Sequence, residues 1–358
     1  MKPTVSYSAW ACFAHCRYKY KKQYEQGLSP KTQSFEADLG TGIHKHLAFY
    51  FQKYFESSEI PPVSIMDMSA IDWREQLLDG GISIEGNAVA DKFNTAMDDG
   101  ITEMVHKSVQ IAKRTVAFFH PEDYEVVAIN GVPCIEYEFN YPLPDHFAFS
   151  SFHGFIDLVI MEKRTGLIYI VDHKSSKSLK PEEDEIFRIQ LAVYQYILQK
   201  LGIPVAGTMT LQILAKDLEV PELLASGKMS RKAIKSDWST YKQALLDKGL
   251  DPTEYAQEMI PKLNNVTFFM KNIVLRSQVE IENTWNEIFY PALVEMSDLE
   301  IPRWRYLSSF LCRSCSFKEV CLGELQGRDM SYEETTFFYK RKDKVYEMMS
   351  DMEIEIEI

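Results

Sequence analysis

Two short apolar segments, each carrying an aspartate, constrain the fold of this chain more than any other feature of its sequence. They span residues 154–160 and 167–172, and a polar turn that ends in Gly166 separates them. Apolar runs of this length on either side of such a turn predict a β-hairpin. The hairpin brings Asp157 alongside Asp172 near its open end, so two carboxylates interrupt strands that are otherwise buried.

Lys174 adds an ammonium group to this pair of carboxylates. Side chains alternate along a strand, so Asp172 and Lys174 point to one face and His173 to the other. Taken alone, either aspartate motif is more often a solvated ion pair. Charges within apolar strands are costly without a partner or a metal ion, and carboxylate oxygens suit Mg²⁺ or Mn²⁺. A nearby lysine can orient or deprotonate a water molecule, or stabilise charge on a phosphate.

Four motifs together resemble those of the PD-(D/E)XK nuclease superfamily, in its RecB-like branch. In chain order they are Leu39-Gly40-Thr41-Gly42-Ile43-His44, Gly154-Phe155-Ile156-Asp157, Asp172-His173-Lys174 and Gln190-Leu191-Ala192-Val193-Tyr194. The resemblance implies an α/β fold with a restriction-endonuclease-like mixed sheet core flanked by helices. It also implies metal-dependent hydrolysis of phosphodiester bonds in DNA.

The resemblance further implies a role for each matching residue. Lys174 would position or activate the attacking water. Gln190 and Tyr194 lie four residues apart on one helical face and would hold the DNA backbone or the lysine. The divalent metal would be held by His44, by Asp157 and Asp172, and by the peptide carbonyl of His173.

Two neighbouring residues compete for places in this metal site. His46 lies two positions after His44 and points in another direction, so both imidazoles cannot serve one ion from the same helix face. We prefer His44 because it matches the motif. Glu136 lies on an expected strand at 133–141, where an acid of the site and an exposed residue of a half-buried strand are equally good interpretations.

Near the C-terminus three cysteines form a C-x2-C-x5-C pattern, and a closed cluster needs a fourth thiolate. Cys16 resembles the first cysteine of the iron–sulfur RecB-like nucleases, although Arg17 stands where proline is usual. The resemblance implies a [4Fe-4S] cluster, with Zn²⁺ as the alternative, that staples the two ends of the chain. Cys12 could replace Cys16, while Cys134 is better explained as a small buried apolar residue. The predicted ligands are Cys16, Cys312, Cys315 and Cys321.

Cations and aromatic residues alternate beside Cys16, which is typical of channels for single-stranded DNA. The candidate contacts are Arg17, Lys19, Tyr20 and Lys21, and a solvated helix face is an equally good interpretation. The net charge of −13 argues against a protein that coats nucleic acid with its whole surface. We therefore expect DNA contact to be confined to one groove beside the metal site.

The pattern of periodicity predicts one nuclease domain over 1–358 with large helical insertions. Its expected parts are an N-terminal helical segment (1–38), a core (39–215) with a helical insertion at about 60–125, a helical region (216–330) and a helical, then acidic tail (331–358). Within them we expect helices at 6–26, 42–55 and 184–201, a strand at 205–214, and a mostly helical pattern from 230 to 300.

These features favour a metal-dependent DNA exonuclease that acts on ends or single strands, in recombination, repair or the processing of phage and mobile-element DNA. The alternatives are a CRISPR-adaptation-type nuclease that trims DNA, and a non-catalytic iron–sulfur scaffold subunit that binds DNA. The sequence contains no G-x-x-x-x-G-K-[ST] motif, so a helicase or recombination partner would be a separate protein. We expect a cytoplasmic protein with no membrane partner, because neither a signal peptide nor an apolar span is visible.

Overall fold

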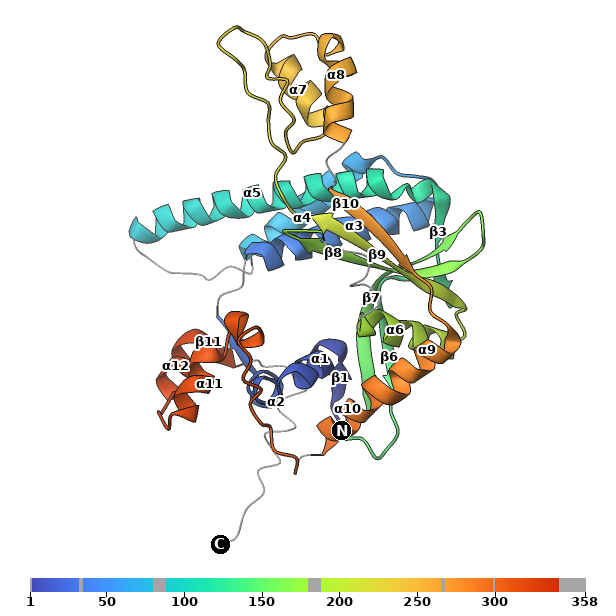
Figure 1. Ribbon diagram of the computed structural model, residues 1–358, viewed down its shortest axis with the longest axis vertical. Helices are drawn as coiled ribbons and strands as arrows, with labels where there is room; N and C mark the ends of the chain where they lie inside the picture. The colour runs from blue at the N-terminus through green and yellow to red at the C-terminus, as the bar shows by residue number, and fades with distance from the viewer. Residues whose placement is uncertain are drawn as a thin grey trace.

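A computed structural model describes residues 2–31, 35–79, 88–179, 188–264, 268–298 and 300–340. Its centre is a seven-stranded mixed sheet with helices on both faces (Figure 1). The predicted mixed α/β core flanked by helices is thereby confirmed. In the described part of the chain, none of the helices is long and apolar enough to cross a membrane.

The predicted hairpin forms the middle of this sheet. β7 (Ser151–Glu162) pairs antiparallel with β8 (Ile168–Ser176), with Leu158 opposite Val171. β9 lies parallel to β8 and pairs antiparallel with β10, while three further strands lie along β7. The remaining strands of the sheet are β1 (Thr4–Ser6), β3 (Tyr124–Val126), β6 (Ile135–Pro142), β9 (Val205–Leu214) and β10 (Phe269–Val274). A separate small hairpin joins β4 (Ala128–Ile129) to β5 (Val132–Pro133).

Three helices cover one face of the sheet because their apolar stripes match its apolar side chains. These helices are α3 (Phe35–Ser57), α4 (Met66–Asp79) and α5 (Ala88–Phe119). Ile43 and Leu47 of α3 are fully buried in one cluster with Leu158 and Val171 from the hairpin. This packing fixes α3 against the strands that carry both aspartates.

The opposite face is covered by helices from both halves of the chain. Phe152 and Val159 of β7 share a core cluster with Phe13 and Ile197. The helices on this side are α1 (Tyr7–His15), α6 (Ile189–Lys200), α9 (Gln278–Asn283), the π-helix Thr284–Phe289 and α10 (Tyr290–Ser297). α6 ends at Lys200, and Gly202 follows with a φ of 88°, which favours glycine.

Two of the expected helices have different boundaries. The helix expected at 6–26 is interrupted at Cys16, whose extended backbone separates α1 from α2 (Arg17–Tyr20) and the π-helix Lys21–Glu25. The helix expected at 42–55 begins earlier, at Phe35, and ends at Ser57. Residues 184–187 of the helix expected at 184–201 fall outside the described residues.

The region from 230 to 300 is less uniformly helical than its periodicity suggests, because it contains β10. Between β9 and β10 the chain forms a lobe around α7 (Trp238–Asp247) and α8 (Thr253–Asn264), drawn at the top of Figure 1. The lobe has a hydrophobic cluster of its own, which includes Met229, Tyr241 and Tyr255.

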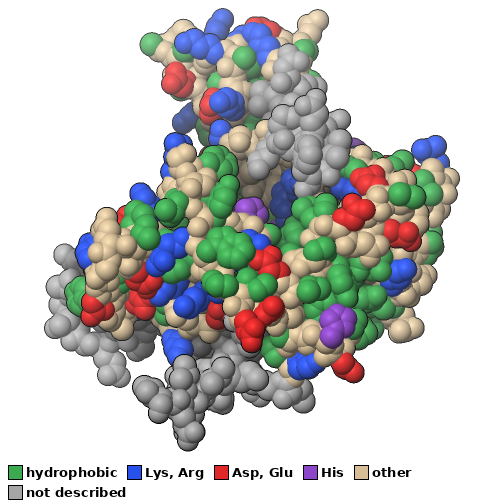
Figure 2. Space-filling view, turned by 60° about the horizontal axis from the view of Figure 1, so that its bottom comes forward, with side chains coloured by type: hydrophobic (Ala, Val, Ile, Leu, Met, Phe, Trp, Pro, Cys, Tyr) green, Lys and Arg blue, Asp and Glu red, His purple; other side chains and the backbone are tan. Residues whose placement is uncertain are grey.

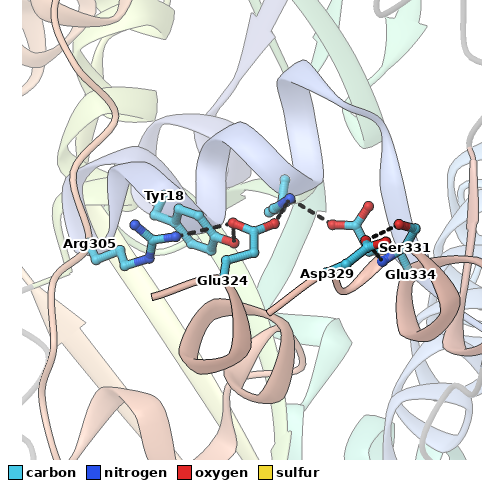
Figure 3. Close-up of polar contacts among 7 residues, drawn as sticks. Tyr18, Arg305, Glu324, Asp329, Ser331 and Glu334 are labelled. Atoms are coloured by element: carbon cyan, nitrogen blue, oxygen red, sulfur yellow. Dashed lines mark hydrogen bonds and ion pairs between the residues drawn. The ribbon is translucent and has the colours of Figure 1, made fainter. Parts of the chain in front are cut away.

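A segment near the N-terminus pairs with a segment from the C-terminal part of the described chain. β2 (Leu28–Pro30) pairs with β11 (Phe338–Lys340), next to α11 (Lys318–Leu325) and α12 (Ser331–Phe337). Between these segments Lys22 Nζ lies 2.5 Å from a Glu324 oxygen and 2.6 Å from a Glu334 oxygen. Figure 3 shows this seam, in which Tyr18 and Arg305 also bond to Glu324. The predicted helical tail extends to Phe337, and residues 341–358 lie outside the described residues.

Candidate metal centre

Three side chains from three different elements converge at one end of the sheet. His44 comes from α3, Glu136 from β6 and Asp157 from β7, and one ligand atom of each lies within 4.8 Å of the others. His44 Nδ1 lies 3.5 Å from Asp157 Oδ2 and 3.7 Å from Glu136 Oε1. An imidazole nitrogen and two carboxylate oxygens that face one point are suitable ligands for a divalent ion.

Small residues allow α3 to approach the strands closely enough to deliver His44. A Cβ on Gly40 would lie 2.9 Å from the hydroxyl of Ser175 on β8, and a Cβ on Gly42 would lie 2.1 Å from the indole of Trp73 on α4. Nothing larger than glycine fits at Gly42 without a shift of Trp73. At this distance His44 Nε2 reaches the backbone carbonyl of His173, 2.9 Å away.

Glu136 joins the group through an unusual backbone conformation. Its φ is +44°, in the left-handed region that costs a non-glycine residue about 1–2 kcal/mol. Its neighbours in the strand, Ile135 and Tyr137, pair normally with Leu158 and Ile156 of β7. The distortion is therefore confined to the residue that faces His44 and Asp157, and strain of this kind is typical of functional sites.

The carboxylate of Asp157 is ionised by its surroundings. Burial by itself would raise its pKa, but hydrogen bonding by His173 and the charge of His44 lower the pKa to about 2. The His173 amide donates to Asp157 Oδ2 over 2.7 Å. Asp157 therefore stays negatively charged across the physiological pH range and is ready to bind a cation.

The pKa of His44 is shifted upwards, in the opposite direction to that of Asp157. Burial disfavours its charged form, yet contact with Glu136 and the charge of Asp157 raise its pKa to about 9. In the metal-free chain the excess of negative charge in this group is thus balanced by a proton on His44. The residues fit a divalent ion, which would displace that proton.

Asp172 lies beside this group but makes different contacts. Its carboxylate is 8% exposed, with Lys174 Nζ 2.8 Å from one oxygen and an Arg188 nitrogen 3.1 Å from the other. Burial and the nearby charge of Asp157 raise its pKa, against the opposing effect of the two cations. His173 points to the face opposite Asp172, as the alternation predicts, and is 3% exposed. Its ring nevertheless lies beside the candidate centre, because its Nδ1 is 3.6 Å from Asp157 Oδ2.

A cavity of about 440 Å³ opens next to Asp172 and Lys174. Tyr7, Arg188 and Gln190 line it, together with Gln212. Gln190 donates to the hydroxyl of Tyr194 over 3.1 Å, which is the pairing expected of residues four apart on α6. Sequence reasoning overlooked Arg188, because an arginine just before a helix carries no motif of its own.

The competition between the two histidines is settled by their packing. His46 is fully buried and bonds to Ser69 Oγ (2.6 Å) and Ser108 Oγ (3.0 Å), where it links α3 to α4 and α5. Burial lowers its pKa to about 4, so it is a neutral core residue. His44 alone of the two faces the acids.

Only some of the predicted cluster cysteines lie near one another. Burial raises the pKa of Cys12 to about 12; the charge of Lys19 opposes this rise, and Cys16 and Cys315 add to it. Burial also raises the pKa of Cys321, with smaller effects from Cys16 and Cys315. The thiol of Cys312 instead lies 3.8 Å from the carbonyl of Tyr306. In the part of the chain that the structure describes, no three cysteine sulfurs lie within 4.8 Å of one another. Cys134 is buried in the core.

The expected nucleic-acid contacts beside Cys16 are divided between the core and the surface. Tyr20 is only 3% exposed and packs against Phe13, so its ring has no free face for a base. Arg17 is paired with Glu295 at 2.6 Å and stacks on Trp304. Lys21 is exposed and Lys19 is half-buried. Helical periodicity alone could not separate the buried side of this segment from its outer side.

Comparison with known protein families gives one match, which covers most of the chain. A sequence model described as the PD-(D/E)XK nuclease superfamily matches residues 4–322. The matched range includes all four motifs and every residue of the candidate centre. No curated protein matches the chain.

Proposed function

We propose that this chain, which belongs to the PD-(D/E)XK nuclease superfamily, is a divalent-metal-dependent deoxyribonuclease that hydrolyses phosphodiester bonds. The observation that carries the proposal is the convergence of His44, Glu136 and Asp157 within 4.8 Å, at the strand end beside Lys174. A purely structural cluster would not need a strained glutamate aimed at an ionised aspartate.

One group of residues in the site would bind the metal ion. His44, Glu136 and Asp157 would hold Mg²⁺ or Mn²⁺, together with Asp172 and the carbonyl of His173. When bound, such an ion polarises the scissile phosphate and lowers the pKa of water.

The residues around Lys174 act on the substrate and the water. The ammonium group of Lys174, 2.8 Å from Asp172, orients the attacking water or stabilises charge on the phosphate. Gln190 lines the cavity and donates to the hydroxyl of the buried Tyr194, and this pair would hold the DNA backbone or the lysine.

We further propose that the enzyme is an exonuclease acting on ends or single strands. The support for this step is the resemblance of its four motifs to the RecB-like branch. A CRISPR-adaptation-type trimming nuclease is the related alternative, and a scaffold subunit without activity is the alternative from another class.

One experiment separates these possibilities. Purified full-length chain is incubated with end-labelled single-stranded, double-stranded and circular DNA, with Mn²⁺, with Mg²⁺ and with a chelator. We expect metal-dependent shortening from the ends, no cleavage of circles, and a loss of about 10²–10⁴-fold in Lys174→Ala, the range typical of a group that acts on the attacking water.

The matched control is Asp72→Asn, which removes an exposed carboxylate of α4 outside the site and should leave activity unchanged. Asp157→Asn should be inactive. Cleavage of circles would overturn the exonuclease assignment. If the wild-type chain binds DNA but hydrolyses none with either metal, the scaffold function is correct instead.

We also propose that the cysteines near the seam hold a [4Fe-4S] cluster, with zinc as the alternative. The support is that Cys321 on the C-terminal segment interacts electrostatically with Cys16 on the N-terminal segment and with Cys315. The fourth ligand is Cys312 or Cys12. Metal analysis and visible absorbance of anaerobically purified Cys312→Ser and Cys12→Ser variants would distinguish them, and stoichiometric zinc in colourless wild-type protein would refute the cluster.

A further inference from the structure

The α7–α8 lobe is attached at the edge of the sheet that carries the candidate centre. In the parallel pairing of β8 with β9, Lys174 lies opposite Gln212 and Ser176 opposite Leu214. Gln212 lines the same cavity as Asp172 and Lys174. The lobe begins directly after Leu214, so its base lies only about 10 Å beyond Gln212 at the usual rise of a strand.

The loop before α7, residues 228–235, is anchored to the rest of the lobe by buried contacts and hydrogen bonds. The side chain of Met229 is buried in the lobe's core, and its amide donates to the Tyr255 hydroxyl over 3.2 Å. The hydroxyl of Tyr241 donates to the carbonyl of Ser230 over 2.7 Å. Arg231 is tied to Glu258 at 2.7 Å. The loop is thus an ordered part of the lobe.

Three of the exposed residues of this loop are lysines, and the carboxylate of Glu219 accepts a hydrogen bond from the backbone amide of the third, Lys235, over 3.1 Å. Lys228, Lys232 and Lys235 are all exposed, and in the part of the chain that the structure describes none of them forms an ion pair. From 228 to 235 the sequence Lys-Met-Ser-Arg-Lys-Ala-Ile-Lys contains no acid, in a protein with a net charge of −13. Figure 2 shows the cationic side chains gathered on this lobe at the top of the view.

We propose that Lys228, Lys232 and Lys235 form a second contact surface for the phosphate backbone of the DNA substrate. The proposal rests on the proposed function, which supplies the polyanion. Cations on an ordered loop suit phosphate contacts, which position a nucleic acid without reading its sequence. Because the lobe is attached next to the catalytic edge, the surface would hold the part of the strand that extends beyond the cavity.

The salt dependence of DNA binding tests this surface independently of catalysis. We would measure binding of the full-length chain to a labelled duplex by fluorescence anisotropy, without divalent metal, over a range of salt concentrations. Each phosphate contact contributes about −0.9 to the slope of log K against log salt. The variant Lys228→Gln/Lys232→Gln/Lys235→Gln should therefore flatten the slope by about 2–3. The variant with arginine at the same three positions should retain it.

The matched control is Lys242→Gln/Lys248→Gln, which removes exposed cations of α7 and its C-cap in the same lobe, outside the 228–235 loop, and should leave the slope unchanged. Hydrolysis of a small chromogenic phosphodiester reports on the catalytic site alone, because such a substrate does not reach the lobe. Wild-type chain that binds DNA but hydrolyses neither substrate would refute the proposed function only.

The surface is refuted if the triple glutamine variant keeps the wild-type slope, or if the control flattens it equally. An unchanged slope combined with loss of a protein partner would assign the loop to protein recognition instead. Should the triple variant fail to fold, Lys232→Gln alone decides, with an expected change of about 0.9.

Discussion

Glu136 has a strained backbone conformation, and its side chain is part of the candidate metal centre. Its φ of +44° is unfavourable for a glutamate, while its carboxylate lies 3.7 Å from His44. Sequence alone left this residue open, since alternation along a strand says which face a side chain occupies and nothing about local distortion. Among the residues that the structure describes, the group of three possible ligand atoms includes Glu136, which favours the interpretation as an acid of the site.

We therefore expect that two substitutions of Glu136 can reduce activity equally and yet differ in their effect on stability. Glu136→Gln and Glu136→Asn both remove the negative charge, but asparagine tolerates the left-handed region better than glutamine. We expect both variants to lose metal-dependent hydrolysis, and Glu136→Asn to be more stable than Glu136→Gln by up to about 1 kcal/mol. Urea denaturation in the absence of metal measures the difference, and equal stability would contradict the strain.

At the scale of elements, α3 is the part of the site most dependent on close packing. Its motif singled out His44 from the sequence, but the reason for its glycines became visible only in the structure. Gly42 faces Trp73, and a helix-to-helix contact across 31 residues leaves no local signal. For the same reason β10 was overlooked, because its pairing with β9 spans the whole lobe.

Two glycine-to-alanine substitutions in helices should therefore have opposite effects on the stability of the folded chain. Gly42→Ala forces Trp73 to move and should destabilise the chain by about 1–3 kcal/mol, as overpacked cores do. Gly100→Ala on α5 meets no atom within 4 Å, so the higher helix propensity of alanine should stabilise it by up to about 1 kcal/mol. Thermal unfolding of both variants checks the pair. A stable Gly42→Ala protein with full activity would show that α3 does not need this close contact.

At the scale of the whole molecule, the chain closes on itself beside the nuclease core. The cysteine spacing, through its resemblance to that of the iron–sulfur nucleases, implied a link between the N- and C-terminal segments, and the seam around Lys22 and Glu324 joins residues of both segments. The same spacing could not predict which cysteines face one another, because the break at Cys16 turns α2 relative to α1. The net charge of −13 is likewise compatible with DNA because the cations occupy particular surfaces, among them the lobe loop.

The central claim is that His44, Glu136 and Asp157 form a centre for a divalent ion, and a titration of Mn²⁺ into chelator-treated protein tests it most directly. We expect binding by wild type and Asp72→Asn, and none at this site in Asp157→Asn or His44→Ala. Because the pKa of His44 is raised to about 9, the ion must displace a proton, so affinity should increase as the pH rises from 6.5 to 8.5. Equal Mn²⁺ binding by wild type and Asp157→Asn at every pH would contradict the account.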